Sequence, residues 1–186
     1  RLYGTAQLVT ASRTQPDREL ISTDYNNNQP LVTSTHLFSA PLEGTRLAKG
    51  RWTYEGGTIL NPTITLSQGC VFFVETTKSI NGTGQHSLEI LQENDLRIVC
   101  LDSKTGGKLW SRPLQNGLEQ CLNILFVAAS GENLVVTGSH LDSDNDTLYR
   151  VNCYSSKTGD ELWRASHLKG LPGAFTHGEQ VHHPVT

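Results

Sequence analysis

The sequence predicts an all-β chain made of repeated four-stranded antiparallel sheets. The main observation is an internal repeat, in which residues 97–110 and 150–163 align without a gap at a spacing of 53 residues. Eight of the fourteen positions are identical, where chance would give about one. A fixed period of this size indicates an array of similar units. The identical pairs are Arg97/Arg150, Cys100/Cys153, Ser103/Ser156, Lys104/Lys157, Thr105/Thr158, Gly106/Gly159, Leu109/Leu162 and Trp110/Trp163.

Each unit has the pattern of a β-hairpin. A run rich in β-branched and apolar residues is followed by Ser-Lys-Thr-Gly, in which Gly106 and Gly159 can adopt a positive φ. The returning strand contains Trp110 in one unit and Trp163 in the other. Because a single four-stranded sheet cannot bury both of its faces, we expect the sheets to stack. Both tryptophans should then be buried as wedges between neighbouring sheets.

The segment from Asp102 to Trp110 resembles the D-x-x-T-G-x-x-x-W signature of the quinoprotein-type (PQQ-like) β-propeller repeat. The second copy departs from this signature only at Ser155, which replaces the Asp. The resemblance implies a β-propeller segment of about three four-stranded antiparallel blades, belonging to a larger ring of about 7–8 blades. It also implies that the motif covers the end of the third strand of a blade and the start of the fourth.

The expected blades cover residues 1–56, 57–113 and 114–168, and residues 169–186 start a further blade. The first blade is a degenerate copy of the unit that ends in Trp52, because the spacing from Trp52 to Trp110 is close to the repeat period although the turn does not match. An uninterrupted apolar run predicts that residues 70–75 form a strand buried on both faces. The predicted strands are 2–10, 19–23, 31–39, 49–54, 63–66, 70–75, 97–102, 108–112, 122–129, 134–140, 148–154, 161–165 and 179–186.

Composition excludes several classes of partner. A net charge of −3 and a pI near 6.2 argue against a nucleic-acid-binding surface, which needs a clustered basic face. The longest apolar run, residues 124–129, is too short to span a membrane. The chain starts at Arg1 instead of Met, so we expect a processed or excised piece.

The four cysteines lack the spacing of a local metal or haem motif. Cys70, Cys100, Cys121 and Cys153 include no C-x-x-C and no adjacent pair. Cys100 and Cys153 occupy equivalent positions inside strands, which favours buried thiols over a disulfide between them.

Three carboxylates stand at alternate positions in one loop, Asp142, Asp144 and Asp146. This spacing is typical of loops that bind a hard cation such as Ca²⁺. An EF-type loop would next require Gly at position 147 and Glu at position 153, where the chain has Thr147 and Cys153. A solvated hairpin tip is therefore the favoured interpretation, with a Ca²⁺ site as the alternative.

Histidines gather near the end of the chain, at His177, His182 and His183. On a strand, His182 and His183 would point to opposite faces, so both could not bind one metal without further ligands. Structural or surface histidines are the favoured interpretation, and ligation of a metal or haem is the alternative.

The leading functional hypothesis is a non-catalytic, exported propeller segment that serves as a scaffold or binding surface. It resembles the blade-only repeat proteins of bacterial envelopes, which implies a periplasmic or secreted location. Its expected partners are the remaining blades, from the same precursor or from another chain.

The alternative is a fragment of a PQQ-dependent quinoprotein oxidoreductase. In that family the quinone is held by a stacking Trp, an adjacent Cys pair and Ca²⁺ with Glu, Asn and Asp ligands. The adjacent Cys pair is absent, so PQQ and Ca²⁺ are possible cofactors that no local motif supports. A carbohydrate-processing propeller enzyme is a third hypothesis, for which no pair of catalytic acids stands out.

Overall fold

The structure is a computed structural model that describes residues 1–9, 33–41, 50–77, 95–121, 123–141, 144 and 147–169. Apart from one 3-10 helix, η1 (Leu118–Gln120), the regular elements in these ranges are β-strands, as expected for an all-β chain. None of the helical structure in these ranges has the length and apolar character required to cross a bilayer. The strands are β1 (Leu2–Val9), β2 (Thr33–Ala40), β3 (Trp52–Ser67), β4 (Cys70–Thr76), β5 (Leu96–Asp102), β6 (Lys108–Pro113), β7 (Asn123–Ser130), β8 (Asn133–Leu141), β9 (Thr147–Ser155) and β10 (Glu161–Lys169).

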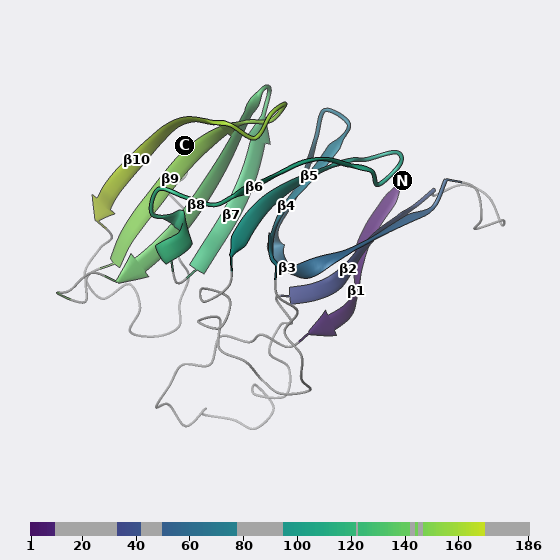
Figure 1. Cartoon of the computed structure of the whole chain (residues 1–186), viewed down its shortest axis with the longest axis horizontal. Helices are drawn as coiled ribbons and strands as arrows, with labels where there is room; N and C mark the ends of the chain where they lie inside the picture. Colours follow the sequence, from purple (N-terminus) through teal and green to yellow (C-terminus); the bar gives the residue numbers. More distant parts are fainter. Residues whose placement is uncertain are drawn as a thin grey trace, which may run out of the picture.

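The strands form two antiparallel sheets in which each strand pairs with its neighbour in the chain. The first sheet has the order β1-β2-β3-β4-β5-β6, and the second has the order β10-β9-β8-β7. The repeated motif joins β5 to β6 in the first sheet and β9 to β10 in the second. Figure 1 shows the second sheet stacked beside the β4–β6 part of the first, as neighbouring blades of a propeller stack. The expected antiparallel sheets are confirmed in these ranges, as one sheet of six strands and one of four.

The first sheet has six strands because β3 is shared between two parts of it. The sequence predicts separate strands at 49–54 and 63–66, but the structure joins them in one strand of 16 residues. The start of β3 pairs with β2, and its end pairs with β4. Gly57 lies just before Ile59 and Leu60, which pair with both β2 and β4, and a Cβ placed on it would be 1.6 Å from the carbonyl oxygen of Thr76. The close approach of β3 to the end of β4 at this bend requires a residue without a side chain.

The bend produces two hydrophobic cores. One lies within the first sheet, where β2 and the start of β3 pack on β4 and β5, and the other lies between the two sheets. Strand β4 separates the two cores, with Phe73 in the first and Phe72 in the second, so its predicted burial on both faces is confirmed. The first core comprises Leu37, Trp52, Ile59, Val71, Phe73, Val99 and Leu101. The second includes Phe72, Val74, Ile98, Cys100, Trp110, Leu118, Val127, Leu134, Val136 and Tyr154.

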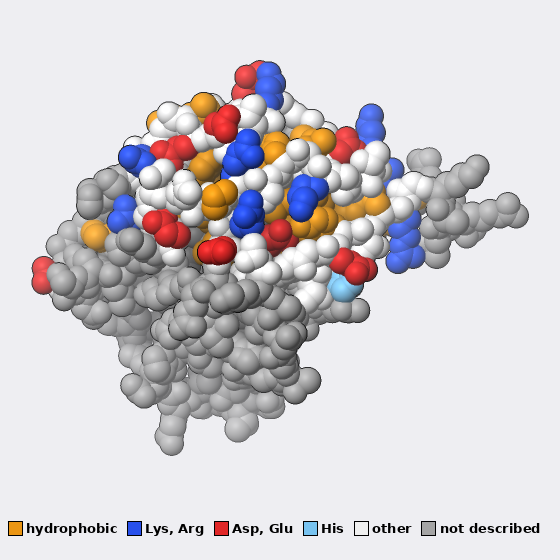
Figure 2. Space-filling view, in the orientation of Figure 1, with side chains coloured by type: hydrophobic (Ala, Val, Ile, Leu, Met, Phe, Trp, Pro, Cys, Tyr) orange, Lys and Arg blue, Asp and Glu red, His pale blue; other side chains and the backbone are white. Residues whose placement is uncertain are grey.

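The surface of the strands mixes both signs of charge. Figure 2 shows Lys and Arg side chains interspersed with Asp and Glu over the sheets, with hydrophobic atoms visible between them. No single-sign face stands out in this view, which agrees with the small net charge. The strands predicted at 19–23 and 179–186 lie outside the described residues, and the blade boundaries stay predictions.

Candidate functional site

The first copy of the motif is a turn held by the carboxylate of Asp102. Its Oδ1 accepts hydrogen bonds from the Thr105 amide at 2.7 Å, the Thr105 hydroxyl at 2.9 Å and the Lys104 amide at 2.9 Å. Gly106 closes the turn with a φ of 73°, a conformation that favours glycine. The amide of Ser103 donates to the carbonyl of Gly69, which ties this turn to the turn between β3 and β4.

The second copy keeps the same backbone although it lacks the acid. Ser155 Oγ accepts one hydrogen bond in the turn, from the Thr158 amide at 3.3 Å. Gly159 has the same φ of 73°, and the Ser156 amide donates to the carbonyl of Glu132. The turn conformation therefore follows from the Thr-Gly pair and the strand pairing, while Asp102 adds hydrogen bonds to the first copy.

Each turn receives a tryptophan from an earlier strand, Trp52 from β3 and Trp110 from β6. The indole N–H of Trp52 donates to the carbonyl of Ser103 at 3.1 Å, and that of Trp110 donates to the carbonyl of Ser156 at 3.1 Å. We call this arrangement the tryptophan joint. Both indoles are buried, with 8% and 9% of their surface exposed, so their N–H groups need these acceptors.

The glycine of each turn lies directly under the indole ring. A Cβ placed on Gly106 would lie 2.6 Å from the ring of Trp52, and a Cβ on Gly159 would lie 2.6 Å from the ring of Trp110. Glycine is therefore required at these positions for two reasons: the backbone has a positive φ, and the indole leaves no space for a Cβ. An aromatic ring lies near each indole, with Tyr3 at 6.1 Å from Trp52 and Phe72 at 6.0 Å from Trp110, measured between ring centroids.

The charges around the joint differ between its two copies. In the second copy Arg112 and Asp160 form an ion pair at 3.5 Å, and both side chains are largely exposed. The equivalent positions of the first copy hold Tyr54 and Gly107, which cannot form such a pair. Exposed ion pairs contribute little to stability, so the absence of this pair from the first copy matters little. The parts that both copies share are the indole, the carbonyl and the glycine.

Trp163 differs from the expectation of burial, since 50% of its surface is exposed. It pairs with Cys153 on β9 in the same way that Trp110 pairs with Cys100 on β5, so its position in the repeat is equivalent. Within the described ranges no turn covers it and no carbonyl accepts a hydrogen bond from its indole. Its exposure is therefore not the result of a different position in the sheet.

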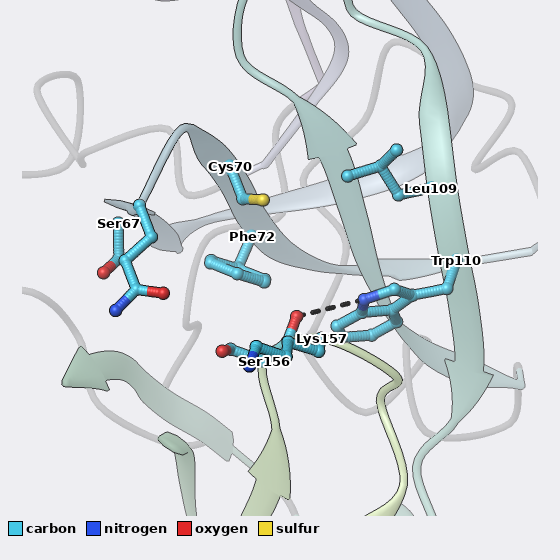
Figure 3. Close-up of a pocket in the computed structure, with 8 residues that line it drawn as sticks. Ser67, Cys70, Phe72, Leu109, Trp110, Ser156 and Lys157 are labelled. Atoms are coloured by element: carbon cyan, nitrogen blue, oxygen red, sulfur yellow. Dashed lines mark hydrogen bonds between the residues drawn. The ribbon is translucent and has the colours of Figure 1, made fainter. Parts of the chain in front are cut away.

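A cleft of about 310 Å³ adjoins the second joint. Figure 3 shows the hydrogen bond from Trp110 to Ser156 at this cleft, which is lined by Ser67, Gln68, Cys70, Phe72, Leu109, Trp110, Ser156 and Lys157. Its only charged lining side chain, Lys157, forms an ion pair with Glu132.

All four cysteines are free thiols. Cys100 and Cys153 are buried, as predicted. Burial raises the pKa of Cys121 to about 12, and burial together with the neighbouring Cys70 raises the pKa of Cys100. Because the thiolate is the reactive form, burial makes Cys100 and Cys121 poor nucleophiles at neutral pH.

A buried carboxylate that the sequence did not predict lies at the bend of β3. Glu75 accepts hydrogen bonds from the Tyr54 hydroxyl at 3.0 Å and from the Gly57 amide at 3.1 Å, and only 6% of its surface is exposed. Burial, reinforced by the charge of Glu75, raises the pKa of the Tyr54 phenol. Tyr54 is thus neutral and serves as a donor, and the cluster fixes the bend.

The predicted metal ligands do not form a described site. Asp144 is an exposed turn residue, whereas Asp142, Asp146, His177, His182 and His183 lie outside the described residues. Within the described ranges no three His, Cys, Asp or Glu side chains are grouped in a way that could hold an ion. The Ca²⁺ and haem alternatives therefore stay predictions.

Replacing Asp102 by Ser, the residue of the second copy, should reduce stability in a pH-dependent way. Hydrogen bonds from the Thr105 amide and hydroxyl hold the pKa of Asp102 below its ordinary value. When folding lowers the pKa of a carboxyl group, the ionised group stabilises the fold at pH values above its unfolded pKa of about 3.9. This stabilisation is lost as the pH falls through the folded pKa. Urea midpoints of the native chain and Asp102→Ser should therefore differ most near neutral pH and converge in acid. A difference independent of pH would contradict the role of the carboxylate, and Ser155→Asp should show the reverse change.

The chain is similar in structure to proteins whose structures are solved. No protein-family model matches the sequence, and no curated protein matches it. Among solved structures, a europium-containing methanol dehydrogenase is similar, with a TM-score of 0.46 and 18% sequence identity over 73% of this chain. The match covers 22% of that protein, so this chain spans about a fifth of its length.

Proposed function

We propose that this chain is a non-catalytic, exported β-propeller segment that serves as a scaffold or binding surface within a larger assembly. The observation that supports this proposal is the tryptophan joint, which occurs twice with the same atoms and the same distance. Both Thr-Gly turns of the repeat are used to hold one blade against the next. The most strongly repeated residues of the sequence therefore have a stacking role.

The joints suit a rigid scaffold. Each combines a buried aromatic surface, a satisfied indole N–H and a glycine contact that leaves no room for adjustment. We infer that further blades, from the same precursor or from another chain, continue the array into a ring of about 7–8 blades. The periplasmic or secreted location is part of this proposal and rests on the resemblance to blade-only repeat proteins of bacterial envelopes.

The alternative is a fragment of a PQQ-dependent oxidoreductase, for which the described residues supply fewer supporting observations. Trp52 and Trp110 are buried in the joints with one ring face against a glycine turn, whereas Trp163 keeps an exposed indole. The four cysteines are free thiols and include no pair adjacent in sequence that could border a quinone. We therefore derive no PQQ-dependent redox step for this chain.

A titration with PQQ in the presence of Ca²⁺ tests the proposal. We expect no saturable change in the quinone absorbance band and no reduction of an electron-accepting dye when an alcohol is supplied. The matched control repeats the titration with EDTA, which separates Ca²⁺-dependent binding from adsorption. Saturable binding that requires Ca²⁺, together with dye reduction, would overturn the scaffold proposal in favour of the oxidoreductase.

A further inference from the structure

We propose that Cys70 and Cys100 form a redox-sensitive thiol pair, which a small, neutral disulfide compound converts into a disulfide bond between β4 and β5. The pair is a modification site that the scaffold function neither uses nor requires. The reagent enters through the cleft beside the second joint and reacts first at Cys70.

The two cysteines lie on neighbouring strands and on the same face of the first sheet. Cys70 pairs with Asp102 and Phe72 pairs with Cys100, so Cys70 and Cys100 are diagonal neighbours across β4 and β5. Both belong to the core between the two sheets, in which Cys100 is buried and Cys70 packs against the buried residues. Their thiol groups also approach each other, because Cys70 acts on Cys100 through a side-chain hydrogen bond. The two sulfur atoms are therefore neighbours in space.

Cys70 is the member of the pair that a reagent in solution can reach. It is partly exposed, whereas Cys100, Cys121 and Cys153 are buried. Cys70 lines the cleft of about 310 Å³, and Figure 3 shows its sulfur near the ring of Phe72. The other three cysteines do not line this cleft. A small disulfide compound therefore meets Cys70 before any other thiol of the folded chain.

The reaction consists of two thiol–disulfide exchange steps. In the first, the Cys70 thiolate attacks one sulfur of the compound RSSR, the S–S bond of the compound breaks, and one molecule of RSH leaves. In the second, the Cys100 thiolate attacks the Sγ atom of Cys70, and the second molecule of RSH leaves. The two protons of the protein thiols end on the two RSH molecules. The two electrons that the pair loses reduce RSSR.

The second step should be the slower one. Burial, reinforced by the nearby Cys70 and Asp102, raises the pKa of the Cys100 thiol, so little of it is present as the attacking thiolate. The mixed disulfide between Cys70 and the reagent should therefore accumulate before the pair closes. This order of products is a signature of the pair, because a buried thiol cannot react first.

The diagonal placement favours a bond that is easily reduced. Diagonal neighbours in an antiparallel pair have Cα atoms about 7–8 Å apart, whereas unstrained disulfides join Cα atoms about 4.4–6.8 Å apart. Cys70 lies at the first position of β4, directly after the turn that contains Gly69, so the adjustment falls at a strand end. Strained disulfides are the labile and regulatory ones. The pair therefore suits a reversible modification better than a permanent cross-link.

The second sheet contains a matched internal control. Cys153 has the place in the repeat that Cys100 has in the first copy, and it is equally buried. Asn133 pairs with Ser155 in the way that Cys70 pairs with Asp102, so the diagonal neighbour of Cys153 is an amide and not a thiol. Cys153 should therefore stay reduced under conditions that oxidise Cys100.

The test exposes the folded full chain to bis(2-hydroxyethyl) disulfide, blocks the remaining thiols with iodoacetamide and maps the products by mass spectrometry. The number of free thiols, counted after unfolding, should fall from four to two. Peptide mapping should find one bond, between Cys70 and Cys100, preceded by the mixed disulfide on Cys70. Circular dichroism checks that the chain stays folded, and an excess of 2-mercaptoethanol should restore the four thiols.

Two variants separate the steps. Cys70→Ser should leave its three thiols unmodified, because no accessible thiol remains, and Cys100→Ala should stop at the mixed disulfide on Cys70. The products of the native chain decide the proposal even where a variant fails to fold. Four free thiols after prolonged exposure would overturn it, as would a mixed disulfide on Cys70 that never closes. A bond to Cys121, to Cys153 or to a second chain would also overturn it.

Discussion

Trp110→Ala is expected to lower the free energy of unfolding by about 3–5 kcal/mol, the range for truncation of a core aromatic side chain. The indole lies between the first and second sheets, packs over Gly159 and contacts Phe72. Its removal leaves a cavity in the core between the sheets and also leaves the carbonyl of Ser156 without its indole donor. Urea denaturation followed by circular dichroism measures the change.

Trp163→Ala is the matched control, because this residue has the same place in the repeat but is half exposed. It should cost about 1 kcal/mol or less in the isolated chain. Trp110→Phe separates packing from hydrogen bonding, since it retains an aromatic ring but removes the N–H donor, and should cost about 1–3 kcal/mol. An equal loss for Trp110→Ala and Trp163→Ala would contradict the role of the joint.

The hairpins of the motif are the part of the fold that the sequence predicts best. The predicted strands 97–102 and 108–112 match β5 and β6 almost to the residue, and those at 148–154 and 161–165 match β9 and most of β10. The reason is local, because the Ser-Lys-Thr-Gly turn specifies its own conformation and the flanking residues are rich in β-formers. Repetition of the pattern at a fixed spacing adds the information that the units stack.

Features that depend on contacts distant in sequence were not predictable. The continuity of β3 is not apparent from the sequence, because Gly56, Gly57 and Pro62 are typical of a break in a strand, while the pairing with β2 and β4 holds the strand together. The Glu75–Tyr54 hydrogen bond joins residues on two strands, and the only local signal was a lone acid at the end of an apolar run. The exposure of Trp163 depends on which sheet covers it, and the motif alone cannot show this.

Gly57→Ala is expected to destabilise the fold by roughly 3 kcal/mol or more, at the upper end of what overpacking costs. The new Cβ would lie 1.6 Å from the carbonyl oxygen of Thr76, far inside any van der Waals contact. That oxygen belongs to the backbone of β4, and Thr76 is paired with Thr58 on β3, so it cannot rotate away as a side chain could. Relief requires separation of β3 from β4 at the bend, which would also disturb the hydrogen bond from the Gly57 amide to Glu75.

Gly69→Ala is the control, since this glycine lies in the turn between β3 and β4 at a φ of 78° with no atom within 4 Å of a new Cβ. It should cost only the strain of a left-handed residue, about 1–2 kcal/mol. Urea denaturation of both variants compares a backbone clash with conformational strain in the same pair of strands. If Gly57→Ala proved as mild as Gly69→Ala, the close approach of β3 to β4 would be wrong. The bend that places Trp52 over Gly106 would then need another cause.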